Sequence, residues 1–200
     1  MRKTGIMGGT FNPIHNGHLM LAKEAYRQFN LDEVLFMPCG VPYMKAGQKV
    51  ESGQIRAEMT ALAIRDIPEF VLSTLEIEQT GNTYTYATLE RLKELNPDTE
   101  YYFIVGADSL FYMTEWVYPE RIFANCCILA AVRNGKTISD MEAQIRLLQK
   151  QYNADIRLLQ IAGIDISSSD IRQKVSLGEP IGQEVPETVR TYIEKKGLYK

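Results

Sequence analysis

Hydrophobic and polar residues follow two different periods along most of the chain. Short apolar runs with strand character recur at residues 3–9, 33–38, 70–77, 101–107, 126–132 and 155–161. Apolar residues spaced three and four positions apart predict helices over 16–29, 53–66, 84–95, 118–125, 140–151, 169–177 and 186–196. Strands that alternate with helices predict an α/β fold, a doubly wound parallel sheet with helices on both faces.

Local sequence signals mark where several helices begin and end. Ser139 and Glu142 match a capping box, and Ser167 with Asp170 matches the same [ST]-x-x-[DE] pattern later in the chain. Two glycines are placed to end the last two helices: Gly178 and Gly197. These signals predict helices from 140 and from 169 onward.

The length and the even composition predict one domain over residues 1–200, with 165–200 as a closing C-terminal helical segment. We find no linker, internal repeat or low-complexity tract in the sequence. Hydrophobic residues make up 45% of the chain, which is enough for a sizeable core and argues against disorder. In doubly wound sheets, ligands bind beyond the carboxyl ends of the strands, where the strand order switches.

Charge and cysteine content exclude several classes of protein. The net charge of −3 argues against a broad nucleic-acid surface or a basic membrane patch, so a bound polyanion must be held by a few local groups. Three cysteines without CxxC spacing argue against a disulfide framework or a zinc ribbon. No signal peptide or membrane-length apolar run is visible. We expect a reduced, cytoplasmic protein; its oligomeric state, a homo-oligomer included, stays open.

The segment after the first predicted strand reads MGGTFNPIHNGHLMLA. It contains the only two histidines of the chain, His15 and His18, beside a predicted helix that Asn16 is placed to cap. A glycine-rich turn between a strand and a helix is where α/β folds bind phosphate, although this one is neither GxGxxG nor a Walker loop. Imidazole N–H groups suit phosphate oxygens, so we expect both histidines to face an anionic ligand.

Two other interpretations of the histidine pair stay open. Histidines three residues apart can bind a metal ion, but a third ligand is not evident, and Cys39 is only a distant candidate. The pair can also lie at the surface and serve as helix caps.

A second segment, DIDISSSDIRQKV, precedes a late helix. The hydroxyl of Ser167 and the first N–H groups of this helix form an anion site without net positive charge. Arg172 adds a forked cation suited to phosphate oxygens. Alone, the segment also fits an ordinary capped helix with a solvated arginine. Two phosphate-type turns in one chain favour the phosphate interpretation.

The first segment resembles the HxGH signature of the nucleotidyltransferase superfamily, which includes adenylyltransferases, cytidylyltransferases and class I aminoacyl-tRNA synthetases. Nearly the whole chain is similar to bacterial nicotinate-nucleotide adenylyltransferases, through the segments NTYTYATLERL, FIVGADSLFYMTEW, AAVRNG, DISSSDIR and VPETVRTYIEKKGLY. The sequence departs from that family at three positions. Asn12 stands where an aspartate is common, and Tyr43 and Met44 replace a proline and a histidine before a retained Lys45.

The resemblance implies a Rossmann-like nucleotidyltransferase fold with C-terminal helices, and it implies specific site residues. The implied catalytic residues are His15, His18 and Arg172. The implied ATP contacts are Gly8, Thr10, Phe11, His15, His18, Gly106, Asp108, Arg133, Ile166, Ser167, Ser168 and Arg172. The implied contacts to nicotinate mononucleotide are Lys45, Thr85, Asp108 and Trp116. Mg²⁺ is expected on the ATP phosphates, without a protein metal site.

Several of these residues also have structural interpretations. Trp116 is by composition more often a core residue, and Thr85 and Asp108 can cap helices. Phe11 and Arg133 can be a packing residue and a surface residue.

The resemblance implies the reaction of ATP with nicotinate mononucleotide to deamido-NAD (nicotinate adenine dinucleotide) and pyrophosphate, in NAD biosynthesis. The nucleophile is a phosphate monoester with a second pKa of about 6, so no protein base is required. The alternatives are a pantetheine-phosphate adenylyltransferase, a cytidylyltransferase or a non-catalytic nucleotide-binding module. The segments around Thr85 and Trp116 argue against the first two, and both histidines and ISSSDIR are intact, which argues against the third.

Overall fold

The computed structural model describes residues 1–41, 50–132, 137–161 and 166–200. Six parallel strands form one sheet in the order β3-β2-β1-β4-β5-β6. The strands are β1 (Arg2–Gly9), β2 (Glu33–Pro38), β3 (Phe70–Leu72), β4 (Thr99–Gly106), β5 (Cys127–Ala131) and β6 (Ile156–Leu159). This confirms the predicted doubly wound sheet, and the strand order switches between β1 and β4.

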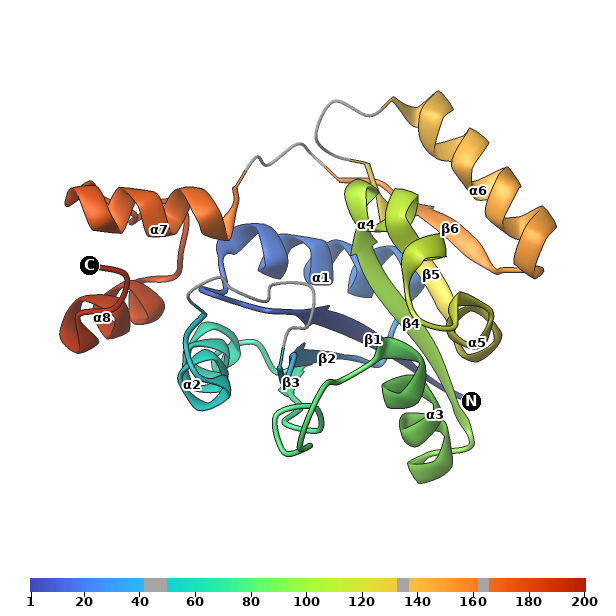
Figure 1. Ribbon diagram of the computed structural model, residues 1–200, viewed down its shortest axis with the longest axis horizontal. Helices are drawn as coiled ribbons and strands as arrows, with labels where there is room; N and C mark the ends of the chain where they lie inside the picture. The colour runs from blue at the N-terminus through green and yellow to red at the C-terminus, as the bar shows by residue number, and fades with distance from the viewer. Residues whose placement is uncertain (42–49, 133–136, 162–165) are drawn as a thin grey trace.

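Helices connect the strands and cover both faces of the sheet (Figure 1). They are α1 (Asn16–Phe29), α2 (Gly53–Ile64), α3 (Thr85–Leu95), α4 (Ala107–Tyr112), α5 (Pro119–Asn125), α6 (Ile138–Tyr152), α7 (Ser168–Leu177) and α8 (Glu187–Lys196), with a 3₁₀ turn η2 (Met113–Glu115). One hydrophobic cluster joins α1, α2, α7 and α8 to the sheet, and a second joins α3, α4, α5 and α6. The right-handed crossovers of a parallel sheet require helices on its faces, which explains the two clusters.

The C-terminal helices pack into the first of these clusters. Ile171 of α7 and both Val189 and Ile193 of α8 are fully buried there. In Figure 1, α7 and α8 lie together at one end of the molecule, beside the start of α1 and beside α2. The prediction of one domain closed by its C-terminal segment stays a prediction, and this shared core supports it.

One predicted strand was wrong in extent, and one short helix was not predicted. The predicted strand over 70–77 ends at Leu72, because the chain turns back at Thr74, whose carbonyl accepts from the N–H of Glu78 (3.0 Å). Apolar alternation continues through the turn because Leu75 and Ile77 face other packed groups, so periodicity alone did not show the strand end. The short helix α4 was not predicted, since its six residues are too few for a helical period.

The helix ends differ from the sequence signals in two places. His15, not Asn16, is the N-cap of α1. Helix α6 begins with a capping box formed by Thr137 and Asp140 rather than by Ser139 and Glu142. The other predicted signals are confirmed. The Ser167 hydroxyl accepts from the Asp170 N–H (3.1 Å), and Gly178 and Gly197 cap α7 and α8 with φ of 73° and 62°.

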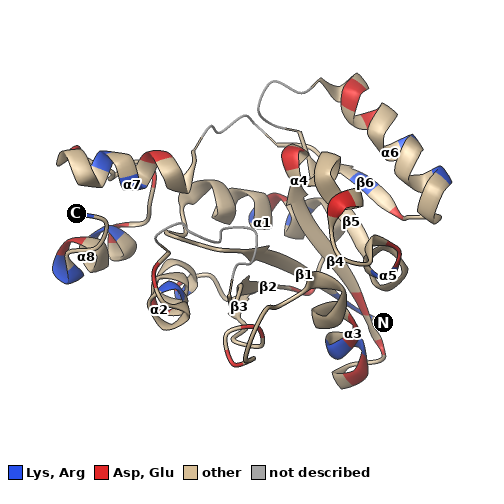
Figure 2. Cartoon of the chain, viewed as in Figure 1, with Lys and Arg blue, Asp and Glu red and all other residues tan. Residues whose placement is uncertain are grey.

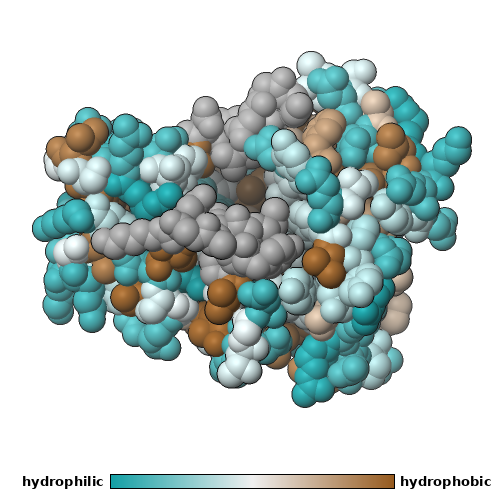
Figure 3. All heavy atoms as spheres, viewed as in Figure 1, coloured by the Kyte–Doolittle hydropathy of each residue, from teal (hydrophilic) through white to brown (hydrophobic). Residues whose placement is uncertain are grey.

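Acidic and basic residues both occur on each of the longer helices (Figure 2), and hydrophilic residues make up much of the coloured part of the face in Figure 3. Hydrophobic residues on that face occur in small separate groups. Among the described residues, no helix has the length and apolar character needed to cross a bilayer.

Candidate active site

A large cavity of the described structure lies where the strand order switches. It measures about 720 Å³ and opens beyond the carboxyl ends of β1 and β4. Its lining includes eight of the residues predicted for the site: Gly8, Thr10, His18, Thr85, Gly106, Asp108, Trp116 and Ser167. Residues from the first third, the middle and the end of the chain therefore meet at the position where this fold class binds ligands.

The turn after β1 leaves no room for an additional side chain. A Cβ at Gly9 would lie 2.9 Å from the ring of Phe11, which itself has a φ of 50° and is buried. The Phe11 ring meets the His18 imidazole edge-on, with 4.9 Å between ring centroids. Phe11 therefore supports His18 from behind and does not line the cavity.

The two histidines stack on each other but occupy different positions. Their ring centroids are 3.6 Å apart with an interplanar angle of 24°. His18 lines the cavity, whereas His15 is only 3% exposed and lies behind it. The backbone N–H of His15 donates to His18 Nδ1 (3.3 Å), so a neutral His18 ring carries its proton on Nε2. His18 thus offers an Nε2–H donor to a ligand.

The second motif packs directly against the first. Ser168 Oγ donates to the carbonyl oxygen of Pro13 (2.9 Å), and Arg172 Nη1 donates to that of Asn12 (2.9 Å). Ser167, the N-cap of α7, reaches the cavity wall. The structure therefore brings the N-terminus of α7 beside the turn between β1 and α1. Ile166 is half-buried and packs against the hydrophobic cluster that joins α1, α2, α7 and α8 to the sheet.

The end of the chain holds the first motif in place. The backbone and side-chain N–H groups of Asn16 donate to the carbonyl oxygens of Glu184 (2.8 Å) and Gln183 (2.9 Å). The Tyr199 hydroxyl donates to Asn12 Oδ1 (3.0 Å), and burial raises the pKa of this phenol, so it stays a donor at neutral pH. An asparagine at position 12 supplies the acceptor oxygen that this arrangement uses.

This arrangement predicts a role for Tyr199 in activity as well as in stability. Removing its hydroxyl with Tyr199→Phe leaves Asn12 without that donor. We therefore expect the free energy of unfolding, measured by urea denaturation, to fall by about 1 kcal/mol. We also expect kcat to fall several-fold, because Asn12 lies in the turn that leads into α1, where His18 lies in the first turn of the helix. Tyr192→Phe is the matched control, since the Tyr192 hydroxyl donates to Glu58 (2.6 Å) away from the motif. Equal activity in the two variants would contradict the prediction.

The far side of the cavity is formed by α3, α4 and η2. Thr85 is the first residue of α3, and Trp116 follows η2, half-buried and edge-on to Phe103 (6.2 Å between centroids). Gly106 is the N-cap of α4, and Asp108 is exposed in its first turn. These residues place a helix N-terminus, a hydroxyl and an aromatic face on one wall.

Some residues of the cavity had no signal in the sequence. Glu76 lines it, and its Oε1 accepts from the Thr88 hydroxyl (2.7 Å); burial raises the pKa of this carboxyl. Cys39 was weighed only as a metal ligand and lines the same wall, where burial raises the pKa of its thiol. Glu76 fell within a predicted strand, so nothing in the sequence pattern pointed to the cavity.

Two predicted site residues, Lys45 and Arg133, lie outside the described residues, as do Tyr43 and Met44. Their predicted roles stay predictions.

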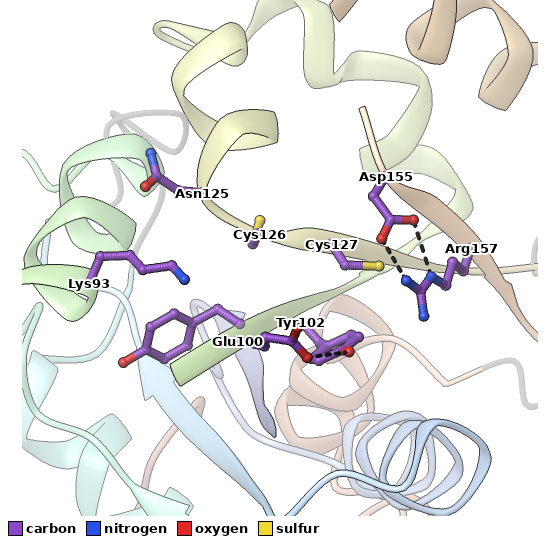
Figure 4. Close-up of a pocket in the computed structure, with 9 residues that line it drawn as sticks. Lys93, Glu100, Tyr102, Asn125, Cys126, Cys127, Asp155 and Arg157 are labelled. Carbon is purple, nitrogen blue, oxygen red and sulfur yellow. Dashed lines mark hydrogen bonds and ion pairs between the residues drawn. The ribbon is translucent and has the colours of Figure 1, made fainter. Parts of the chain in front are cut away.

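A smaller cavity of about 170 Å³ lies at the opposite edge of the sheet (Figure 4). It lies at the amino ends of β4, β5 and β6, and Arg157 pairs there with both carboxylate oxygens of Asp155 (3.1 and 2.7 Å). Burial raises the pKa of the Cys126 thiol, and that of Cys127 to about 12, so neither is a thiolate at neutral pH. None of the predicted site residues lines this cavity.

Comparisons with known proteins found a matching family model and similar curated proteins. A family model described as cytidylyltransferase-like matches residues 6–174. A curated protein of Lachnoclostridium phytofermentans, named "Probable nicotinate-nucleotide adenylyltransferase", is 44% identical over 199 residues, covering 100% of both chains. A protein of the same name from Streptomyces coelicolor is 38% identical, covering 97% of this chain and 99% of its own.

Solved structures show the same fold. The Plasmodium falciparum nicotinic acid mononucleotide adenylyltransferase complexed with NaAD superimposes with a TM-score of 0.84 at 22% identity, covering 100% of this chain and 98% of its own. The same enzyme complexed with APC gives a TM-score of 0.81 with the same coverage.

Proposed function

Because this chain belongs to the nicotinate-nucleotide adenylyltransferase family, we propose that it transfers the adenylyl group of ATP to nicotinate mononucleotide, with deamido-NAD and pyrophosphate as products. The observation that carries the proposal is the shared cavity, in which His18 and the start of α7 face Thr85 and Trp116. One side suits a polyphosphate, and the other suits a ring that bears a carboxylate.

The side of the cavity formed by β1, α1 and α7 suits ATP. The first N–H groups of α7 and the positive end of its dipole favour a polyphosphate near Ser167. His18 Nε2–H is suited to an oxygen of the α-phosphate, where charge develops during transfer. Arg172 lies next to these groups and suits the outer phosphates.

The chemical step needs no protein base. A phosphate oxygen of nicotinate mononucleotide attacks the α-phosphorus of ATP, and the bond from that phosphorus to the pyrophosphate oxygen breaks. The attacking monoester has a second pKa of about 6, so it is largely dianionic at neutral pH. The protein contributes in-line positioning and donors for the developing charge, which are the main terms in phosphoryl chemistry.

We infer that Mg²⁺ binds to this site with ATP. Among the residues that the structure describes, no group of three or more His, Cys, Asp or Glu side chains is arranged as a metal cage. Phosphate oxygens and water are the ligands that Mg²⁺ prefers, together with one or two carboxylates. Among the described residues, Asp108 and Glu76 are the carboxylate residues that line the cavity. The bound ion would neutralise charge on the leaving pyrophosphate.

We predict that nicotinate mononucleotide is preferred over its nicotinamide analogue. Thr85 and the first N–H groups of α3 are donors, and donors satisfy both oxygens of a carboxylate but only one side of an amide. In the η2 turn, the N–H groups of Met113 and Trp116 already donate to carbonyls, which favours the α3 start as the recognising group. One unmatched buried donor costs about 1–3 kcal/mol, which gives roughly a tenfold to hundredfold preference in kcat/KM.

Two variants separate the parts of this pocket. Thr85→Val removes a donor and should narrow the acid-to-amide ratio of kcat/KM. Trp116→Ala removes the ring on which the pyridine stacks and should weaken both substrates together. Equal kcat/KM for the two mononucleotides in the unmutated protein would contradict this assignment of the pocket. The proposal of adenylyl transfer would be unaffected by that result.

The experiment that tests the proposed function is a screen of acceptors against both ATP and CTP, with pyrophosphate release as the readout. We expect release with ATP and nicotinate mononucleotide. Release only with CTP, or only with phosphopantetheine as acceptor, would assign the chain to another activity. Nucleotide binding without release under every combination would make it a binding module.

A further inference from the structure

Arg56, in the first turn of α2, is one of the largest fully buried side chains of the protein. It is 1% exposed, and it lies behind the cavity rather than in its lining. A guanidinium stays charged in proteins, and burying a charge is costly unless its donors are all satisfied. The contacts of Arg56 therefore show what this buried charge is used for.

All five N–H groups of Arg56 have an acceptor. Nε donates to the carbonyl oxygen of Glu51 (3.0 Å), and Nη1 donates to that of Thr10 (2.7 Å) and to the sulfur of Cys39 (3.8 Å). Nη2 donates to the carbonyl oxygens of Cys39 (2.7 Å) and Gly40 (2.9 Å). A planar fork with five donors joins three separate pieces of backbone, which a lysine with three donors cannot reproduce.

Two of these three pieces of backbone belong to one wall of the cavity. Thr10 follows β1 and Cys39 follows β2, and both residues line the cavity. Gly40 is held closely, since a Cβ there would lie 2.4 Å from the carbonyl oxygen of Glu76, another lining residue. The sheet itself joins the ends of β1 and β2, with a last bond from the Cys39 N–H to the Gly9 carbonyl oxygen (2.9 Å). Beyond that bond, Arg56 joins Thr10 to Cys39 and Gly40 from behind the cavity wall.

The charge of Arg56 also suits anionic substrates. Its hydrogen-bond partners among the described residues are uncharged, and the carboxyl that interacts with its charge is the buried Glu76 in the cavity lining. A cation in a low-dielectric wall is little screened by salt and favours anions in the adjacent cavity.

We propose that Arg56 is a positioning residue for adenylyl transfer, which holds the segments after β1 and β2 in place so that the two phosphate substrates meet in line. The inference rests on the proposed function. A misplacement of reacting groups by about 1 Å can cost on the order of 10²-fold in rate, so the effect falls on kcat.

The test compares Arg56→Ala and Arg56→Lys with Thr60→Val. Thr60 is the control because it is fully buried one turn further along α2, and its hydroxyl donates to the Arg56 carbonyl oxygen without contacting the cavity wall. We expect kcat to fall about 10²-fold in Arg56→Ala and about tenfold in Arg56→Lys at a temperature where circular dichroism shows all three folded. Thr60→Val should lower the melting temperature with kcat unchanged.

Added guanidinium separates positioning from a loss of fold. We expect millimolar guanidinium chloride to restore kcat of Arg56→Ala about tenfold, and sodium chloride at equal ionic strength to restore none. An unchanged kcat in Arg56→Lys, or equal responses to the two salts, would overturn the proposal. If the unmutated protein makes no dinucleotide, the proposed function fails instead. Calorimetry of ATP binding to the same variants then decides the role of Arg56, and we expect weaker binding in Arg56→Ala than in Thr60→Val.

Discussion

Replacing His18 with alanine is expected to lower kcat by about 10²–10³-fold, the scale for loss of one preorganised donor to a developing charge. The ring lies on the cavity wall, and its Nδ1 is engaged by the His15 N–H, which directs the Nε2 proton to the ligand side. Steady-state kinetics with saturating ATP and nicotinate mononucleotide measures the change.

His18→Asn is the matched control for the helix cap. An asparagine oxygen can accept the His15 N–H as Nδ1 does, but it provides no group at the position of Nε2. We therefore expect His18→Asn to keep the melting temperature of the unmutated protein and to lose nearly as much kcat as alanine. Near-normal turnover in a folded His18→Asn variant would contradict a role for His18 in the reaction.

Loss of Arg172 is expected to weaken ATP binding by about 1.5–3 kcal/mol, or roughly tenfold to 150-fold, as for a charge-assisted hydrogen bond. AMP, which lacks the outer phosphates, should lose far less. Arg172 also holds the carbonyl oxygen of Asn12, and a loss through that structural contact would affect ATP and AMP alike.

Calorimetry with both nucleotides separates the two effects of Arg172→Ala. Lys174→Ala provides the control, because Lys174 is a cation of the same helix whose charge is paired with Glu184. Equal losses for ATP and AMP in Arg172→Ala, or a similar loss for ATP in Lys174→Ala, would show that Arg172 does not bind the polyphosphate.

The fold was largely predictable because strand and helix periods differ so clearly in this chain. In the core strand β4, the segment YYFIVG has only buried β-branched or aromatic positions before its final glycine, and the strand lies at the centre of the sheet beside β1. Prediction failed where local packing overrides the period, as at the turn after Leu72, or where an element is too short to have one, as in α4.

The candidate site was predictable only where its residues belong to a contiguous motif. The sequence placed His15 and His18 together, but it could not show that one imidazole is buried behind the other, since that depends on the stacking of the rings. Arg56 had no signal at all. Its partners come from three separate segments of the chain. A buried arginine on a helix therefore cannot be distinguished in the sequence from one at the surface, because its burial depends on how those segments pack.

The most direct test of adenylyl transfer follows the oxygen atoms of the acceptor. Nicotinate mononucleotide with ¹⁸O in its phosphate is incubated with ATP and the unmutated protein, and both products are weighed by mass spectrometry. Attack by this phosphate on the α-phosphorus predicts that all of the label appears in the dinucleotide, which is heavier than deamido-NAD by the mass of that label, and that none appears in pyrophosphate. Absence of that dinucleotide, or label in the released pyrophosphate, would contradict the proposed reaction.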